Sequence, residues 1–136
     1  MAWVVDTCLL MDLVLADPVF KNRAATLLNE KSGEGLVICP PILVELAPAL
    51  IGDMDDAEAF LKTVKVRFDE PWLRADTLAA FGGWHRYIAR RRQDRIPRRP
   101  VADVLIGGFA LRFDGLLTRN AADFRTTFPT LKILEP

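Results

Sequence analysis

Short apolar runs alternate with longer amphipathic segments along this chain. Runs of three or four mostly apolar residues, which end at polar or turn-forming positions, predict buried strands at residues 3–5, 36–39, 116–118 and 131–134. The alternation of apolar and polar side chains over 64–68 is typical of an edge strand. Strands that alternate with helices predict an α/β fold, in which helices cover both faces of a central, mainly parallel sheet.

The segments between the strands carry apolar positions at helical spacing and predict helices over 17–31, 40–50, 53–63, 71–88 and 101–113. Pro48 should end the second of these helices early, because proline lacks the amide that an inner helical turn needs. Gly82 and Gly83 each cost a helix roughly 1 kcal/mol, so we expect the fourth helix to bend there.

The composition is that of a folded protein, since 51% of the 136 residues are hydrophobic and 26% are charged. This length predicts one domain over residues 1–136. No apolar stretch approaches the length of a membrane span, and residues 1–5 lack the basic start of a secretory signal. Cys8 and Cys39 are too few for a disulfide scaffold. We therefore expect a cytoplasmic protein with reduced thiols and no membrane segment.

Four acidic residues fall beyond the carboxyl ends of predicted strands, where open parallel sheets bind their ligands: Asp6, Glu45, Asp103 and Asp123. Asp6 ends the first strand, and Asp103 lies in the first turn of the helix predicted over 101–113. Glu45 shares a helical face with apolar neighbours, so we expect its carboxylate to point inward.

A carboxylate on an apolar face is costly unless it is paired or neutralised, and several carboxylates together raise one another's pKa values. A divalent cation meets both needs, and oxygen ligands favour Mg²⁺ or Mn²⁺ over zinc. Each acid also has an ordinary explanation: Asp103 can favour the positive end of its own helix, and Glu45 can pair with an arginine. The metal-site interpretation therefore depends on the four acids meeting at one edge of the sheet.

A set of short stretches runs through the whole chain in a family-like order and spacing: VVDTCLL, VEL, PVADVLIGGFA and LLTRNAADF, followed by the ending LKILEP. This ordered set resembles the PIN-domain ribonucleases, and most closely the VapC-type toxins of toxin–antitoxin pairs. The resemblance implies a PIN-like fold. It also implies an endoribonuclease that depends on Mg²⁺ or Mn²⁺ and leaves a 5′-phosphate and a 3′-hydroxyl.

By this resemblance, Asp6, Glu45 and Asp103 match the three acids that hold the metal ion in the catalytic site. The fourth acidic role is assigned to Asp123, which would orient the attacking water or serve as its base. Family members place this acid at either of two sites. Asn120 occupies the first of them as a polar helper, so the choice between the two residues stays open.

Two hydroxyl residues, Thr7 and Thr118, match positions that support the acids by hydrogen bonding. Local bonding within a turn or a helix cap explains both threonines equally well.

Seven arginines and one aspartate lie in residues 86–99, which gives this segment a charge of seven minus one, or +6, in a chain of zero net charge. The arginine fork binds two phosphate oxygens at once. The candidates for contact with an RNA backbone are Arg86, Arg90, Arg98 and Arg99. A solvated helix face, or a docking site for an acidic partner, accounts for the same cluster.

The resemblance also implies partners, namely a small cognate antitoxin protein and a second copy of the chain in a homodimer. One alternative is a catalytically degenerate PIN fold that binds RNA or another protein. The amide at Asn120 favours this alternative, whereas the retention of Asp6, Glu45 and Asp103 disfavours it.

Overall fold

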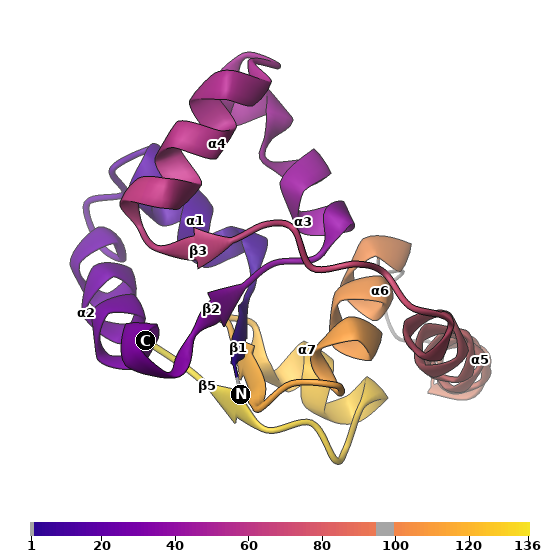
Figure 1. Ribbon diagram of the computed structural model, residues 1–136. Helices are drawn as coiled ribbons and strands as arrows, with labels where there is room; N and C mark the ends of the chain where they lie inside the picture. The colour runs from indigo at the N-terminus through magenta and orange to yellow at the C-terminus, as the bar shows by residue number, and fades with distance from the viewer. Residues whose placement is uncertain (1, 95–99) are drawn as a thin grey trace.

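The computed structural model describes residues 2–94 and 100–136, and its centre is a five-stranded sheet (Figure 1). The strands are β1 (Trp3–Val5), β2 (Leu36–Val37), β3 (Val66–Arg67), β4 (Gly115–Leu117) and β5 (Ile133–Leu134). Their order across the sheet is β3-β2-β1-β4-β5, and every neighbouring pair is parallel. The predicted α/β class is confirmed, and β3 lies at an edge as the alternating pattern of 64–68 indicates.

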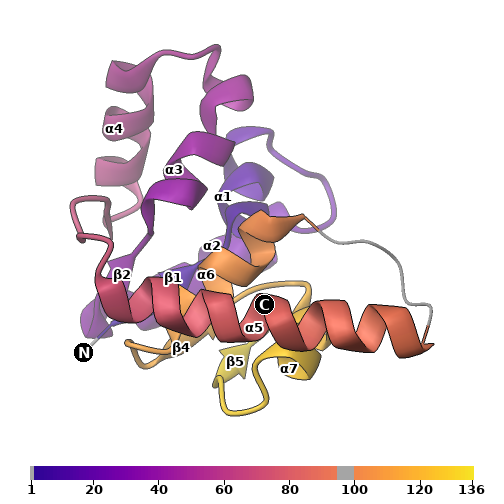
Figure 2. The ribbon, with the colours of Figure 1, turned by 90° about the vertical axis from the view of Figure 1, so that its right-hand side faces the viewer.

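Seven α-helices and two 3₁₀ turns surround the sheet in the described part of the chain. They are α1 (Thr7–Val14), α2 (Lys21–Lys31), η1 (Ser32–Glu34), α3 (Pro40–Glu45), η2 (Ala47–Leu50), α4 (Met54–Thr63), α5 (Arg74–Asp94), α6 (Val101–Ala110) and α7 (Ala121–Thr127). Helices α1 and α2 lie on one side of the sheet, and α5, α6 and α7 lie on the other (Figures 1 and 2). Among these residues, no helix combines the length and the apolarity that crossing a membrane requires.

The order of the strands creates a switch point between β1 and β4. After β1, the chain builds β2 and β3 outward on one side, and it then returns to place β4 and β5 on the other side of β1. Val5 and Leu117 are paired at the carboxyl ends of these two strands, so Asp6 and Thr118 leave the sheet side by side. Open parallel sheets bind ligands at such a reversal, because the loops diverge there and leave room.

Helix α5 runs without a break from Arg74 to Asp94, so the predicted bend at the glycine pair is wrong (Figure 2). Gly83 serves close packing instead. A Cβ atom at Gly83 would lie 2.5 Å from Cζ of Phe128, and one at Gly107 in α6 would collide with the same ring. Phe128 therefore seals the junction of α5, α6 and α7 only because both helices carry glycine where the ring lies.

A buried ion pair fastens α5 to the end of α6. Asp76 is only 1% exposed, and Arg112 binds it with both branches of its guanidinium, at 2.8 Å from Nε to Oδ1 and 3.0 Å from Nη2 to Oδ2. Arg112 also donates to the carbonyl oxygen of Pro71. This pair lies among the helices on one face of the sheet and provides a structural reference for a second Arg–Asp pair described below.

Candidate active site

Asp6 lies at the switch point, in the first position after β1, and its carboxylate also caps α1. The side-chain Oδ1 accepts a hydrogen bond of 2.8 Å from the amide of Thr7, which begins that helix. Only 4% of Asp6 is exposed. Such a cap normally satisfies a helix end at the protein surface, whereas here it fixes a nearly buried carboxylate at the opening of the sheet.

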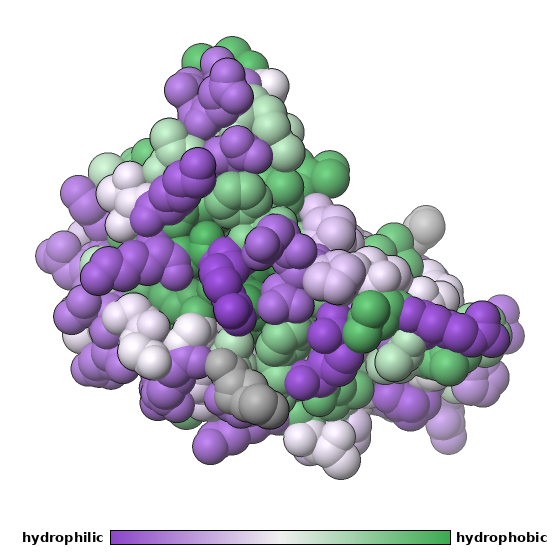
Figure 3. Space-filling view, in the orientation of Figure 1, coloured by the Kyte–Doolittle hydropathy of each residue, from purple (hydrophilic) through white to green (hydrophobic). Residues whose placement is uncertain are grey.

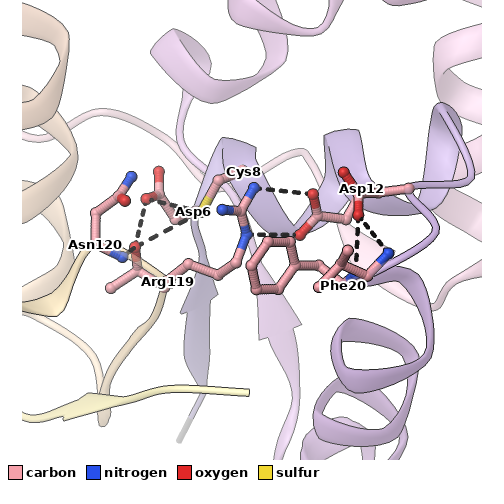
Figure 4. A network of polar contacts seen from close by, with 9 residues as sticks. Asp6, Cys8, Asp12, Phe20, Arg119 and Asn120 are labelled. Atoms are coloured by element: carbon pink, nitrogen blue, oxygen red, sulfur yellow. Dashed lines mark hydrogen bonds and ion pairs between the residues drawn. The ribbon is translucent and has the colours of Figure 1, made fainter.

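Thr118, the first residue after β4, donates its hydroxyl proton to Oδ2 of Asp6 at 2.7 Å (Figure 4). The same hydroxyl oxygen accepts from the amide of Asn120 at 3.0 Å. The thiol of Cys8 donates to Oδ2 of Asp6 at 3.5 Å. Both Asp6 oxygens are therefore oriented by donors from two elements that are distant in sequence, and the hydroxyl of Thr118 is held by its own partner.

Burial raises the pKa of Asp6 above its usual value, because the charged form loses its solvation. The hydrogen bonds from Thr118, Cys8 and Thr7 and the charge of Arg119 act in the opposite direction without cancelling this effect. The pKa of the Cys8 thiol is raised to about 11 by burial and by the negative charge of Asp6. Cys8 is therefore a neutral hydrogen-bond donor at physiological pH and has little thiolate character.

Glu45 is joined to Asp6 through Thr7. The Thr7 hydroxyl donates to Oε1 of Glu45 at 2.6 Å, while the Thr7 amide bonds Asp6. Glu45 is the last residue of α3 and is exposed, so the expectation that its carboxylate points inward is wrong. The helix ends at this residue, and the buried positions beside it are Ile42 and Leu46. Glu45 thus lies at the rim of the site, within reach of solvent.

Asp103 and Asp123 line one small depression in the surface, together with Thr127 and Phe128. Asp103 lies in the first turn of α6 and Asp123 in the first turn of α7, and each is half-buried. The folded chain arranges the predicted acids as two pairs, one linked by Thr7 and one sharing a depression. Within residues 2–94 and 100–136, no three acidic, cysteine or histidine side chains are grouped closely enough to hold a metal ion.

The supporting residues differ in burial. Thr118 is fully buried, Thr7 is half-buried and Asn120 is exposed. Thr7 donates a hydrogen bond to Glu45 and Thr118 donates one to Asp6, both of which are predicted acids. Asn120 contributes its main-chain amide to Thr118 and precedes α7.

The predicted RNA-contact arginines are only partly described. Arg86 donates from Nε and Nη2 to the carbonyl oxygen of Thr127, at 3.3 and 3.1 Å, and lies over the ring of Phe128. It therefore ties α5 to α7. Arg90 is half-buried on α5. Arg98 and Arg99 lie outside the described residues.

Sequence reasoning missed an ion pair beside the site. Arg119 binds Asp12 with both branches of its guanidinium, at 2.8 Å from Nε to Oδ2 and 2.9 Å from Nη2 to Oδ1. The guanidinium also lies 4.1 Å from the centre of the Phe20 ring (Figure 4). Asp12 is 4% exposed on α1, a helix that the pattern did not predict, so no signal marked it as a buried charge.

No family model and no curated protein matches the sequence. Solved structures do match its fold. One is a chain in the crystal structure of VapBC2 from Rickettsia felis, which was determined with a DNA fragment from its promoter. The match has a TM-score of 0.64 at 15% sequence identity and covers 99% of this chain and 98% of that chain.

A second match is a chain of VapBC-1 from nontypeable Haemophilus influenzae, with a TM-score of 0.68 at 20% identity and the same coverage, 99% of this chain and 98% of that chain. These likenesses span the whole length of both chains. The resemblance to VapC-type toxins is therefore confirmed at the level of the fold.

Proposed function

We propose that this chain is a metal-dependent endoribonuclease and the toxin component of a VapC-type toxin–antitoxin pair. The observation that carries the proposal is the placement of Asp6, a nearly buried carboxylate at the switch point that is linked through Thr7 to Glu45. The fold shared with chains of two VapBC structures supports the same assignment. The site would act on RNA in the cytoplasm.

The chemical type of the proposed donors suits a hard divalent cation, although the described residues do not bring three of them together. The proposed ligands Asp6, Glu45, Asp103 and Asp123 all offer carboxylate oxygens, which Mg²⁺ and Mn²⁺ prefer. Burial holds the pKa of Asp6 above its usual value, and the positive charge that acts on it, Arg119, forms its ion pair with Asp12. An added cation would therefore stabilise the charged form of Asp6. When bound, such an ion lowers the pKa of a water molecule and neutralises charge on a phosphodiester.

The chain's own residues would orient the reactants. Thr118 and Cys8 fix the direction of the Asp6 carboxylate, and Thr7 does the same for Glu45. Asp123 would accept the proton of the attacking water at a carboxylate oxygen. Asn120 is the alternative for this fourth position and would orient the water as a hydrogen-bonding amide without taking its proton. Attack of the water oxygen on phosphorus would break the bond between phosphorus and O3′, and O3′ would take a proton from solvent, which leaves a 5′-phosphate and a 3′-hydroxyl.

The surface offers a place for the proposed antitoxin. Helices α3 and α4, joined by η2, form an arm that rises from the body of the protein (Figure 1). Apolar side chains show over the corner between η2 and α4 (Figure 3), and Val44, Ile51 and Met54 on this arm are 71%, 94% and 53% exposed. Such side chains are costly in water, so a small protein that wraps the arm would stabilise them. A homodimer completes the proposed assembly.

The proposal is tested by incubating total RNA with the purified chain in Mg²⁺, in Mn²⁺ and with a chelator. The wild type should cleave RNA only when the metal is present, and Asp6→Asn should lose at least about a hundredfold of that activity, because it removes a charged ligand. Asp114→Asn is the matched control, since Asp114 precedes β4 at the opposite end of the sheet.

The alternative assignment, a degenerate module, has its own outcome in this experiment. If wild type and Asp6→Asn bind RNA equally and neither cleaves it in either metal, the nuclease proposal is wrong. A size measurement with the co-encoded small protein tests the partners: a chain that stays monomeric and gains no stability from that protein would contradict the toxin assignment.

A further inference from the structure

The second Arg–Asp pair of the fold, Arg119 with Asp12, lies beside the candidate active site (Figure 4). Arg119 stands between Thr118, which bonds Asp6, and Asn120, whose amide bonds Thr118. Its side chain leaves the turn in the other direction and reaches across to α1 (Figure 4). In this segment Thr118 and Asn120 thus lie toward the site, and Arg119 between them anchors the segment to α1.

We propose that Asp12 and Arg119 are positioning residues, which hold the turn at 118–120 so that the Thr118 hydroxyl stays aimed at Asp6. This role rests on the proposed nuclease function and adds to it a device that neither touches the substrate nor holds an ion. The pair itself restrains the turn strongly, because a bidentate guanidinium–carboxylate contact fixes orientation as well as distance.

Three contacts make the anchor rigid. Asp12 is 4% exposed and is engaged at both carboxylate oxygens, which favours a single guanidinium orientation. The Phe20 ring lies 4.1 Å from the guanidinium carbon and covers one face of it. The turn that carries Phe20 is itself fixed, since Asp17 accepts hydrogen bonds from the amides of Val19 and Phe20 at 2.8 and 2.9 Å.

Lysine cannot replace arginine in this arrangement, because a single ammonium group has neither the fork nor the flat face. Residues that orient a metal-binding or catalytic group through a hydrogen bond typically contribute ten- to a hundredfold to affinity or activity. Arg119→Lys and Asp12→Asn should therefore lower kcat by about tenfold or more and weaken Mn²⁺ binding to a similar degree, with KM for RNA changed by less than about threefold.

The pair between Arg112 and Asp76 provides the matched control. It has the same bidentate geometry, with a carboxylate that is 1% exposed, but it fastens α5 to the end of α6 and contacts neither Asp6 nor Thr118. Arg112→Lys and Asp76→Asn should therefore lower the melting temperature about as much as the corresponding Arg119 and Asp12 variants. At a temperature where all variants are folded, these controls should keep wild-type kcat and Mn²⁺ affinity.

Amide hydrogen exchange supplies a readout that does not depend on nuclease activity. The Asn120 amide bonds the Thr118 hydroxyl, so its exchange reports directly on the turn. Exchange at Asn120 should accelerate in Arg119→Lys and Asp12→Asn, and it should match the wild type in the two controls.

Two results would overturn the inference: unchanged exchange at Asn120 in Arg119→Lys, or a fall in kcat and Mn²⁺ affinity that is equally large in the Arg112 and Asp76 controls. A wild type that cleaves no RNA would instead overturn the proposed function, and the exchange rates would still decide whether the anchor positions the turn.

Discussion

Replacing Thr118 by valine tests the central contact of the site, because valine keeps the shape of threonine and removes only the hydroxyl. In the wild type this hydroxyl donates to Asp6 at 2.7 Å and accepts from the Asn120 amide at 3.0 Å, in a position that is fully buried. Serine at the same position keeps the hydroxyl and loses only a methyl group. The comparison of Thr118→Val with the wild type therefore isolates the hydrogen bonds of the hydroxyl, and Thr118→Ser measures the loss of the methyl group alone.

The expected loss follows from the type of bond. A hydrogen bond to a charged group contributes about 1.5–3 kcal/mol. Asn120 is exposed, so its amide can form a hydrogen bond with water in place of the one that it loses to the Thr118 hydroxyl. We expect Thr118→Val to lower the free energy of unfolding by about 2 kcal/mol relative to the wild type at neutral pH. For a chain of 136 residues, this corresponds to a fall in melting temperature of about 8 °C.

The loss of stability caused by Thr118→Val should become smaller as the pH is lowered. The Thr118 hydrogen bond stabilises the charged form of Asp6 and so lowers its pKa, although burial keeps that pKa above its usual value. The difference between Thr118→Val and the wild type should therefore be full above the pKa of Asp6 and shrink as the solution is acidified through it. Urea denaturation at a series of pH values from neutral to acidic measures this difference in the free energy of unfolding. Equal stability of Thr118→Val and the wild type at neutral pH, or a difference that grows on acidification, would refute the reasoning.

Three further predictions concern the same region. Asp6→Asn should be more stable than the wild type at neutral pH and lose this advantage on acidification. The reason is that the pKa of Asp6 is higher in the folded than in the unfolded state, so the stability of the wild type falls as the pH rises. Thermal melts of both proteins across pH would measure this difference. Mn²⁺ at a hundred times its dissociation constant should stabilise the wild type by about 2.7 kcal/mol and leave the Asp6→Asn melt unchanged, as scanning calorimetry can verify. Gly107→Ala should lower the free energy of unfolding by about 1–3 kcal/mol, because the added Cβ would collide with Phe128. Gly33→Ala is the control, since its Cβ would meet nothing within 4 Å, and urea denaturation should show it to be nearly as stable as the wild type.

The strands and most of the helices were predictable because they depend on local patterns. The run that forms β1 ends at Asp6 as expected, and the helix that begins at Pro40 ends as α3 before Pro48. Helices α1 and α7 were missed. The apolar positions continue from β1 into α1 without a turn signal, so the boundary lies in the Asp6 cap alone. Helix α7 has only seven residues, too short for a periodic pattern to emerge.

Helix α5 shows why burial could not be deduced from residue type. Its periodic spacing identifies the helix, yet Phe81 is 76% exposed while Asp76 is 1% exposed. The charge of Asp76 is tolerated only because Arg112, 36 residues later, binds both of its oxygens. The pattern within one segment carries no information about such a partner.

For the candidate site, local patterns in the sequence were enough to place Asp6 directly after one predicted strand and Thr118 at the end of another. The folded arrangement makes these two strands neighbours, so the Thr118 hydroxyl bonds the Asp6 carboxylate across 112 residues. The same folded arrangement leaves Glu45 exposed at the rim of the site, although Ile42 and Leu46 beside it are buried. It also brings Arg119 into an ion pair with Asp12. The physical reason is that secondary structure depends on side chains within a few positions of one another. Strand order, burial and charge pairing depend on contacts that form only when distant segments pack together.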